Sequence, residues 1–105
     1  MEAVTEFLVE FEVNVPAGAP EDEVEDRENA EASAAARLPK QGHLVRLWKL
    51  PAARGQTKAV GLYRAGSQAQ LDGLLDALPL ADWMHVTVTG LASHQNDPVG
   101  ADATA

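Results

Sequence analysis

The sequence predicts an α+β domain of the ferredoxin-like type, a βαββαβ arrangement with a four-stranded antiparallel sheet. Two observations lead to this class. Residues 6–15 and 83–91 alternate apolar and polar side chains, and residues 42–50 and 58–65 form two further strand-like segments. Helical segments at residues 20–38 and 68–78 separate the first strand from the second and the third from the fourth. Both helices then cover one face of the sheet, and a second copy of the chain could cover the other.

The first strand and the first helix follow from alternation and from helix signals. The apolar residues of the strand share one face: Phe7, Val9, Phe11, Val13 and Val15. Residues 16–20 (PAGAP) interrupt regular structure, and the acidic residues 21–23 suit the first turn of a helix. That helix is rich in alanine and glutamate up to Leu38. Because proline disfavours helical geometry in the residue before it, we expect a kink or an end at Pro39.

The remaining elements follow from turn and cap signals. Residues 42–50 and 58–65 are expected to pair as a hairpin through a loop that contains Pro51 and Gly55. Residues 67–70 (SQAQ) have the spacing of a capping box, and an apolar stripe of leucines follows until Pro79. We therefore expect a short amphipathic second helix before the fourth strand, and a polar, frayed tail from His94 onward.

The composition bounds the functional classes. With 105 residues the chain has the size of one domain, which we place at residues 1–96, with a flexible tail at residues 97–105. Its 16 acidic and 8 basic residues provide no basic field for nucleic acid. No segment resembles a membrane span or a secretory signal, so we expect no membrane partner and a cytoplasmic location. A domain this small gains stability from self-association, so we expect a homo-oligomer.

Two glutamates interrupt the apolar face predicted for the first helix. Successive residues of a helix are rotated by about 100° around its axis. The side chains of Val24, Glu28, Glu31 and Leu38 therefore point within about 40° of the same direction. A carboxylate on a buried face is costly unless it is paired or protonated, and such breaks of pattern are typical of functional sites. The plainer interpretations are a misjudged helix phase, a glutamate at the wet edge of the face, or an ion pair of Glu31 with Arg27.

A cation interrupts an apolar face of the second strand. Arg46 falls between Leu44 and Trp48 on that face, which indicates a site for an anion. The plainer interpretation is an arginine at the sheet edge that stacks on Trp48.

The sequence gives no support for cofactor chemistry or covalent intermediates. The chain has no cysteine, which excludes disulfides, thiolate nucleophiles and cysteine-bound metals. Its histidines, at positions 43, 85 and 94, lack metal-ligand spacing. Glycine-rich phosphate loops and a serine nucleophile elbow are absent as well. We therefore expect no metal and no cofactor.

Several segments together resemble the muconolactone delta-isomerase family. They are the strand that ends in Val15-Pro16, the run RLPKQGHLVRLW at residues 37–48, the pattern SxxxLxxxLxxLPL at residues 67–80, and TGLxxH at residues 89–94. The resemblance covers residues 5–96, and the order and spacing of these segments carry it rather than any single motif. It implies a dimeric α+β barrel, assembled further into a decamer, that acts without a cofactor in the catechol branch of the β-ketoadipate pathway.

The resemblance also implies a reaction and roles for the residues singled out above. The family moves a proton within an unsaturated lactone that bears a carboxylate, through a dienolate, so it needs a base and a donor to the enolate oxygen. Glu31 matches a glutamate of the family's long helix and is the expected base, with Glu28 as the second candidate. Expected substrate-binding residues are Arg27, Arg46, Trp48 and His94.

Departures from the family pattern leave the substrate open. Where the family has Asn-Tyr-Ser in the third strand, this chain has Ala59-Val60-Gly61, and Ser93 replaces an arginine before the C-terminal histidine. One alternative is a related dimeric-barrel isomerase or cyclase that acts on a larger biosynthetic intermediate of polyketide type. Another is a ligand-binding module without catalysis. The bulky substrate predicts a wide apolar cavity at residues 59–61, muconolactone predicts donors near Glu31, and the binding module predicts an exposed Glu31.

Overall fold

The computed structural model describes residues 5–99 and confirms the predicted element order. The strands are β1 (Thr5–Asn14), β2 (Leu44–Leu50), β3 (Gln56–Ala65) and β4 (Met84–Leu91). The helices are α1 (Glu21–Lys40) and α2 (Gln68–Asp76), and a short 3-10 helix, η1 (Ala81–Trp83), leads into β4. Most of the predicted tail, from residue 100 onward, lies outside the described residues.

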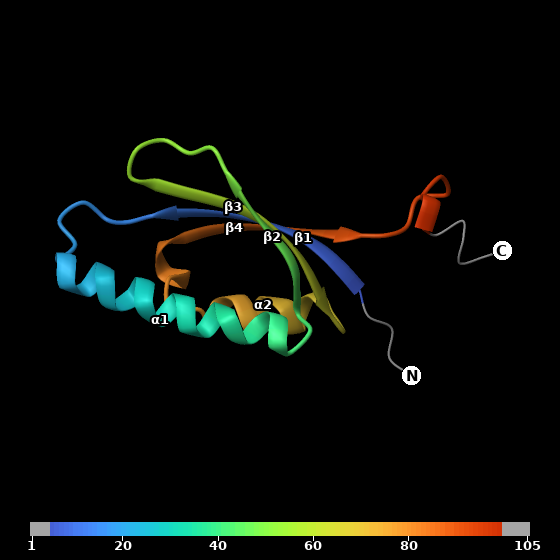
Figure 1. The fold of residues 1–105 in the computed structure, drawn as a ribbon, viewed down its shortest axis with the longest axis horizontal. Helices are drawn as coiled ribbons and strands as arrows, with labels where there is room; N and C mark the ends of the chain where they lie inside the picture. Colours follow the sequence, from blue (N-terminus) through green and yellow to red (C-terminus); the bar gives the residue numbers. More distant parts are fainter. Residues whose placement is uncertain (1–4, 100–105) are drawn as a thin grey trace.

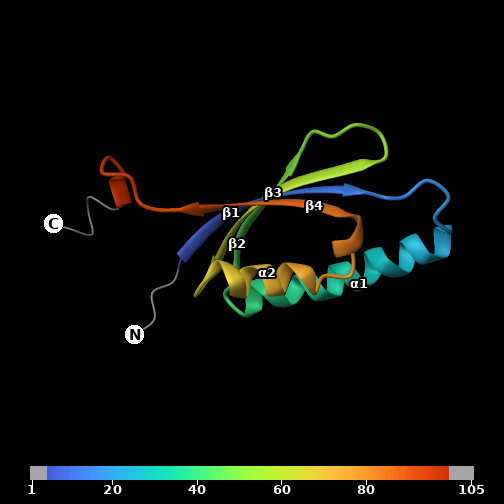
Figure 2. The same cartoon turned by 180° about the vertical axis from the view of Figure 1, so that it is seen from behind.

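The four strands form one antiparallel sheet in the order β2-β3-β1-β4. Both helices lie on the same face of this sheet, as Figures 1 and 2 show from opposite sides. The ferredoxin-like prediction is therefore confirmed for the described residues. No helix in this part of the chain is both long enough and apolar enough to cross a membrane.

The core lies between the sheet and the helices, as the alternation in β1 predicts. Phe7, Val9 and Phe11 project from β1 toward the helices and are buried. Leu71 and Leu75 of α2 close over them, and Val9 and Leu71 have no exposed surface at all. Each large apolar side chain buried in this way contributes about 1.5–3 kcal/mol to folding.

Helix α1 continues past the predicted stop. Pro39 lies inside the helix, which ends at Lys40. A proline in the last turn removes a single intrahelical donor, and three N–H groups after it satisfy the free carbonyls. These bonds run from Gln41 to Arg37 at 3.0 Å, from Gly42 to Pro39 at 3.1 Å and from His43 to Leu38 at 2.9 Å.

The start of α2 follows the predicted capping pattern, and its end does not reach the predicted stop. The Ser67 Oγ accepts the Gln70 N–H at 3.1 Å, and the Gln70 side chain accepts the N–H of Gly66 at 2.7 Å. The helix ends at Asp76, so Leu78 lies beyond it, although Leu78 is still buried.

The outer face of the sheet, which is the face without helices, carries apolar side chains. Leu8, Val60 and Leu62 are half-buried there, and Trp48 of the edge strand β2 is 41% exposed. Charged residues surround them, among them Glu10, which pairs with Val60 across the sheet. An apolar surface with a charged border is typical of a contact between protein chains.

Candidate functional site

A cavity of about 290 Å³ lies between α1 and one end of the sheet. Its walls come from the end of β1, the middle of α1, the start of β3 and the segment after α2. The lining residues are Val13, Val15, Glu28, Glu31, Ala32, Thr57 and Leu80. At this end the β2–β3 hairpin rises away from α1, as Figure 1 shows. The two glutamates that the sequence singled out therefore meet the same cavity.

Glu31 is held in place at the cavity wall. Its side chain is half-buried, and Oε1 accepts the backbone N–H of Leu80 at 3.0 Å. Leu80 is only 8% exposed, so this bond satisfies a donor that water reaches poorly. The second carboxylate oxygen has no such protein partner within residues 5–99, and it is the one available to a ligand.

Glu28 lines the same cavity from one turn earlier in α1, and its side chain is exposed. The helix phase used above is thus close to the observed one, with Val24 and Glu31 half-buried and Leu38 buried. Glu28 occupies the wet edge of that face. Of the two carboxylates, Glu31 has the fixed geometry that a general base requires.

Arg27 contacts the segment before β4 rather than Glu31. Its guanidinium lies 4.5 Å from the centre of the Trp83 ring, and Nη1 donates to the carbonyl oxygen of Pro79 at 3.5 Å. Its ion pairs join Glu23 at 3.4 Å and Asp82 at 3.8 Å. Arg27 therefore fastens α1 to the same segment that Glu31 holds through Leu80, and it lies beside the cavity without lining it.

Arg46 and Trp48 lie on the outer face of the sheet, opposite to Glu31. They pair with Leu62 and Val60, whose side chains project away from the helices. The Arg46 guanidinium lies 5.0 Å from the centre of the Trp48 ring, which matches the plainer interpretation of this arginine. Within one chain these two residues do not share the cavity of Glu31.

The face predicted for Leu44 is wrong. A register shift between Leu44 and Arg46 turns Leu44 to the helix side, where it packs against the core. Strict alternation failed here because a β-bulge inserts one extra residue into a strand.

His94 lies at the opposite end of the sheet from the cavity. It follows Leu91, which pairs with Glu6, whereas the cavity meets β1 at Val13. At about 3.3 Å per residue these two ends of β1 are about 23 Å apart. Figure 1 shows the chain after β4 continuing away from the helices. A role for His94 at Glu31 therefore requires a second copy of the chain.

Tyr63 was missed in the sequence; its backbone pairs with Phe7, six residues along β3 from Thr57 of the cavity wall, and it does not line the cavity. It projects from β3 toward the helices, is only 4% exposed, and packs on Phe11 with ring centres 5.9 Å apart. Burial, and then the negative charge of Glu31, raise the pKa of Tyr63 to about 12. The chain has one tyrosine, and its place on the buried face of β3 was the signal available.

Lys49 was also missed in the sequence. It pairs with Ala59, so it projects from the helix side of β2 and is exposed. Thr57, which lines the cavity, is its diagonal neighbour across the strands, and diagonal neighbours lie about 7–8 Å apart, within reach of a long side chain. Lys49 is thus a cation within reach of Thr57, although it does not line the cavity itself.

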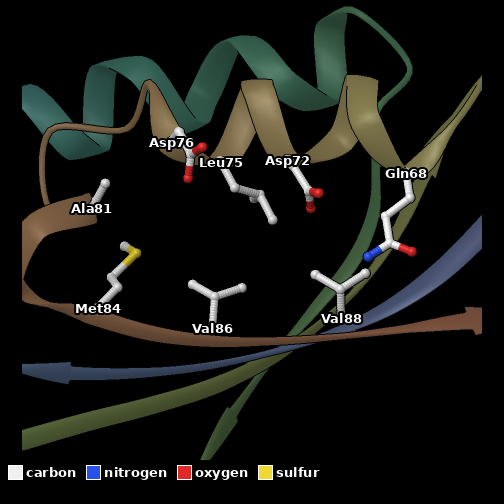
Figure 3. A pocket seen from close by; sticks show the side chains of 8 residues that line it. All are labelled: Gln68, Asp72, Leu75, Asp76, Ala81, Met84, Val86 and Val88. Carbon is white, nitrogen blue, oxygen red and sulfur yellow. The ribbon is translucent and has the colours of Figure 1, made fainter.

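A larger cavity, of about 450 Å³, lies between α2 and β4. Figure 3 shows Asp72 and Asp76 hanging from α2 above Met84, Val86 and Val88. Both aspartates are exposed, and the lining contains no arginine, lysine or histidine. This cavity has nothing to attract an anionic ligand, and we place the candidate site at Glu31 instead. No group of three or more metal-ligating side chains occurs within residues 5–99.

The family model and the curated relatives agree on one family, and a solved structure of that name shares the fold. The family model described as muconolactone delta-isomerase matches residues 5–97. The chain is 34% identical over 91 residues to muconolactone delta-isomerase 1 of Acinetobacter lwoffii, covering 84% of this chain and 88% of that protein. It is 31% identical over 88 residues to the enzyme of Cupriavidus pinatubonensis, covering 84% and 92%. A crystal structure of muconolactone isomerase superposes with a TM-score of 0.79 at 24% identity, covering 89% of this chain and 94% of that one.

Proposed function

The chain belongs to the muconolactone delta-isomerase family, and on this premise we propose that it is a cofactor-independent isomerase that moves a proton within muconolactone, as in the catechol branch of the β-ketoadipate pathway. One observation supports placing this reaction at the cavity. A half-buried carboxylate, that of Glu31, is fixed by a backbone N–H at the wall of a cavity of about 290 Å³. A positioned carboxylate in a small cavity is what a reversible proton transfer at carbon requires.

The reaction needs one group that both removes and returns the proton. The carboxylate of Glu31 takes the proton from the ring carbon that bears the ring oxygen, which breaks that C–H bond and leaves a dienolate. The resulting carboxylic acid then gives the proton to the carbon next to the lactone carbonyl. The double bond shifts and no atoms are lost or gained. The hydrogen bond from Leu80 holds one carboxylate oxygen throughout, so the free oxygen does the transfer.

The size and walls of the cavity favour a small substrate. Sites for small molecules range from about 300 to 1,000 Å³, and this cavity of about 290 Å³ is just below that range. The alternative of a bulky polyketide-type intermediate required a wide cavity at residues 59–61. Ala59, Val60 and Gly61 do not line this cavity, and Val60 projects from the outer face. Muconolactone calls for donors near Glu31, and the hydroxyl of Thr57 in the cavity wall favours it.

The substrate carboxylate needs a cation, and four candidates remain. Arg27 and Lys49 are close to the cavity within one chain, and Arg46 and His94 could act from a second chain. Trp48, beside Arg46, would act with it. Salt screens the interaction between exposed charges beyond about 8 Å at physiological ionic strength. A cation must therefore lie close to the substrate carboxylate to attract it to a chain whose net charge is −8.

We propose a homodimer formed through the outer face of the sheet, assembled further into a decamer as the family resemblance implies. The half-buried Leu8, Val60 and Leu62 and the exposed Trp48 support a contact there. The cytoplasmic location stays a prediction.

A comparison of two matched variants tests the proposal. Purified protein is given muconolactone, and isomerisation is followed together with the exchange of substrate protons against deuterated solvent. We expect the wild type to convert the substrate and Glu31→Gln to lower kcat by about 10²–10⁴-fold. Glu28→Gln, one turn earlier on the same cavity, should lose far less.

Two results would contradict these assignments. A severe loss in Glu28→Gln with near-normal Glu31→Gln would show that Glu28 is the base. If neither substitution changes proton exchange, the isomerase assignment fails and the ligand-binding module takes its place.

A further inference from the structure

We propose that the hydroxyl of Tyr63 donates the hydrogen bond that stabilises the dienolate oxygen formed when Glu31 removes the substrate proton. This inference rests on the proposed isomerase function. It adds the electrophilic partner that the reaction needs, because a base alone leaves the negative charge on the lactone oxygen unsupported. No residue of the third strand was expected to supply this donor, since residues 59–61 are apolar or glycine.

The position of the ring points the hydroxyl toward the cavity. A Cβ atom built on Gly61 would lie 2.6 Å from Cε1 of Tyr63, so the ring leans back along β3 over Gly61. That direction leads toward Thr57, which lines the cavity at the start of the strand. Phe11 supports the ring from β1, two residues before Val13 of the cavity wall. Gly61 is therefore the residue that makes room for the tyrosine.

The state of the hydroxyl suits a donor. Burial and the charge of Glu31 keep Tyr63 protonated at any ordinary pH, since they raise its pKa to about 12. The contribution of Glu31 to this pKa is in keeping with the direction in which the ring leans. No hydrogen bond within residues 5–99 uses this hydroxyl, and no fully buried side-chain oxygen there lacks a partner, so the hydroxyl keeps a small accessible surface although Tyr63 is 4% exposed and does not itself line the cavity. It is free to donate to a ligand.

Glu31 and Tyr63 have different roles in the proton transfer. Glu31 carries the proton from carbon to carbon, as described above. Tyr63 keeps its own proton and shares it in a hydrogen bond that strengthens as charge develops on the lactone oxygen. An interaction of this kind acts mainly in the transition state and therefore affects kcat more than KM.

The kinetic test uses Tyr63→Phe, which keeps the ring and its packing on Phe11 and removes only the hydroxyl. We expect kcat for muconolactone to fall by about 10²–10³-fold, as for other oxyanion donors, with KM within about twofold of the wild type. A fall of less than about tenfold, or a loss confined to KM, overturns the proposal. Failure of the proposed function itself looks different, because the wild type would then leave muconolactone unchanged.

A second pair of variants tests the geometry with a matched control. Gly61→Ala forces the ring off its position and should lower kcat although the hydroxyl is still present. Gly90→Ala is the control, because a Cβ there would lie 3.9 Å from Cε1 of Phe7, an ordinary contact. Equal activities of these two variants would contradict the role of the ring position. Circular dichroism checks that both variants are folded.

A third measurement needs no turnover. Because Tyr63 is the one tyrosine of the chain, labelling tyrosine with ¹³C at the ring carbon that bears oxygen gives a single NMR signal. We expect Glu31→Gln to shift this signal at neutral pH and Glu25→Gln, on the exposed side of α1, to leave it in place. Added muconolactone should shift the wild-type signal as well. A signal indifferent to Glu31→Gln would show that the phenol does not face the base and would overturn the proposal whatever the kinetics.

Discussion

Glu31 has a structural role, as the acceptor of a backbone hydrogen bond, that can be separated from its proposed role as the catalytic base. Its carboxylate accepts the N–H of Leu80 at 3.0 Å, and Leu80 is 8% exposed. Glu31→Ala removes the acceptor and leaves this poorly hydrated donor unpaired, which costs about 1–3 kcal/mol of the free energy of unfolding. Because the bond is only half-buried, the lower part of that range applies, about 1–2 kcal/mol. Glu31→Gln keeps an acceptor oxygen of the same reach and should stay within about 0.5 kcal/mol of the wild type.

Calorimetry at one fixed protein concentration measures the difference, because the melting temperature of an oligomer depends on concentration. For a domain of this size 1 kcal/mol corresponds to about 4–8 °C. We therefore expect the melting temperature of Glu31→Ala to fall by about 5–15 °C and that of Glu31→Gln by less than about 4 °C. Equal melting temperatures for the two variants would refute the structural role of Glu31. A stable but inactive Glu31→Gln would show that the lost activity comes from the missing base and not from unfolding.

Three further predictions concern stability and assembly. Arg27→Ala should lower the free energy of unfolding in urea by about 1–2 kcal/mol, because it removes the stacking on Trp83, and an effect below about 0.3 kcal/mol would contradict this. Ser67→Ala should cost about 1 kcal/mol through the lost cap of α2, measured in the same way, and an unchanged midpoint would show that the cap is not needed. Leu62→Glu should dissociate the dimer in light scattering at micromolar concentration, and an unchanged mass would move the interface elsewhere.

The fold could be predicted because several local signals agree. The alternation in residues 6–15 requires one buried face, and the buried Phe7, Val9 and Phe11 occupy it. The capping pattern at Ser67 begins α2 as expected. Signals that depend on tertiary contacts were less informative. Pro39 was expected to kink or end α1, and the helix includes it because the following N–H groups satisfy the open carbonyls.

The candidate site could be predicted only in part. Glu31 was visible as a carboxylate on an apolar helix face, since helical periodicity fixes which residues share a face. Alternation placed Arg46 and Trp48 on a common face of β2 correctly and Leu44 wrongly, because the register shift after Leu44 is not visible in the sequence. The approach of Tyr63 to Glu31 depends on a ring that leans over Gly61, a long-range arrangement that neither periodicity nor spacing encodes.

The placement of Arg46 opposite to Glu31 leads to a test of whether the site is shared between subunits. If Arg46 of the partner subunit binds the substrate carboxylate, Arg46→Ala should raise KM, and mixing it with Glu31→Gln should restore activity. In such a mixed dimer one site combines an intact Glu31 with an intact arginine from the other chain, and the second site lacks both. We expect about half of the wild-type rate per mixed dimer at low substrate concentration, measured after the two variants are unfolded and refolded together. A mixture no more active than the sum of its parts would place the substrate cation within one chain, at Arg27 or Lys49.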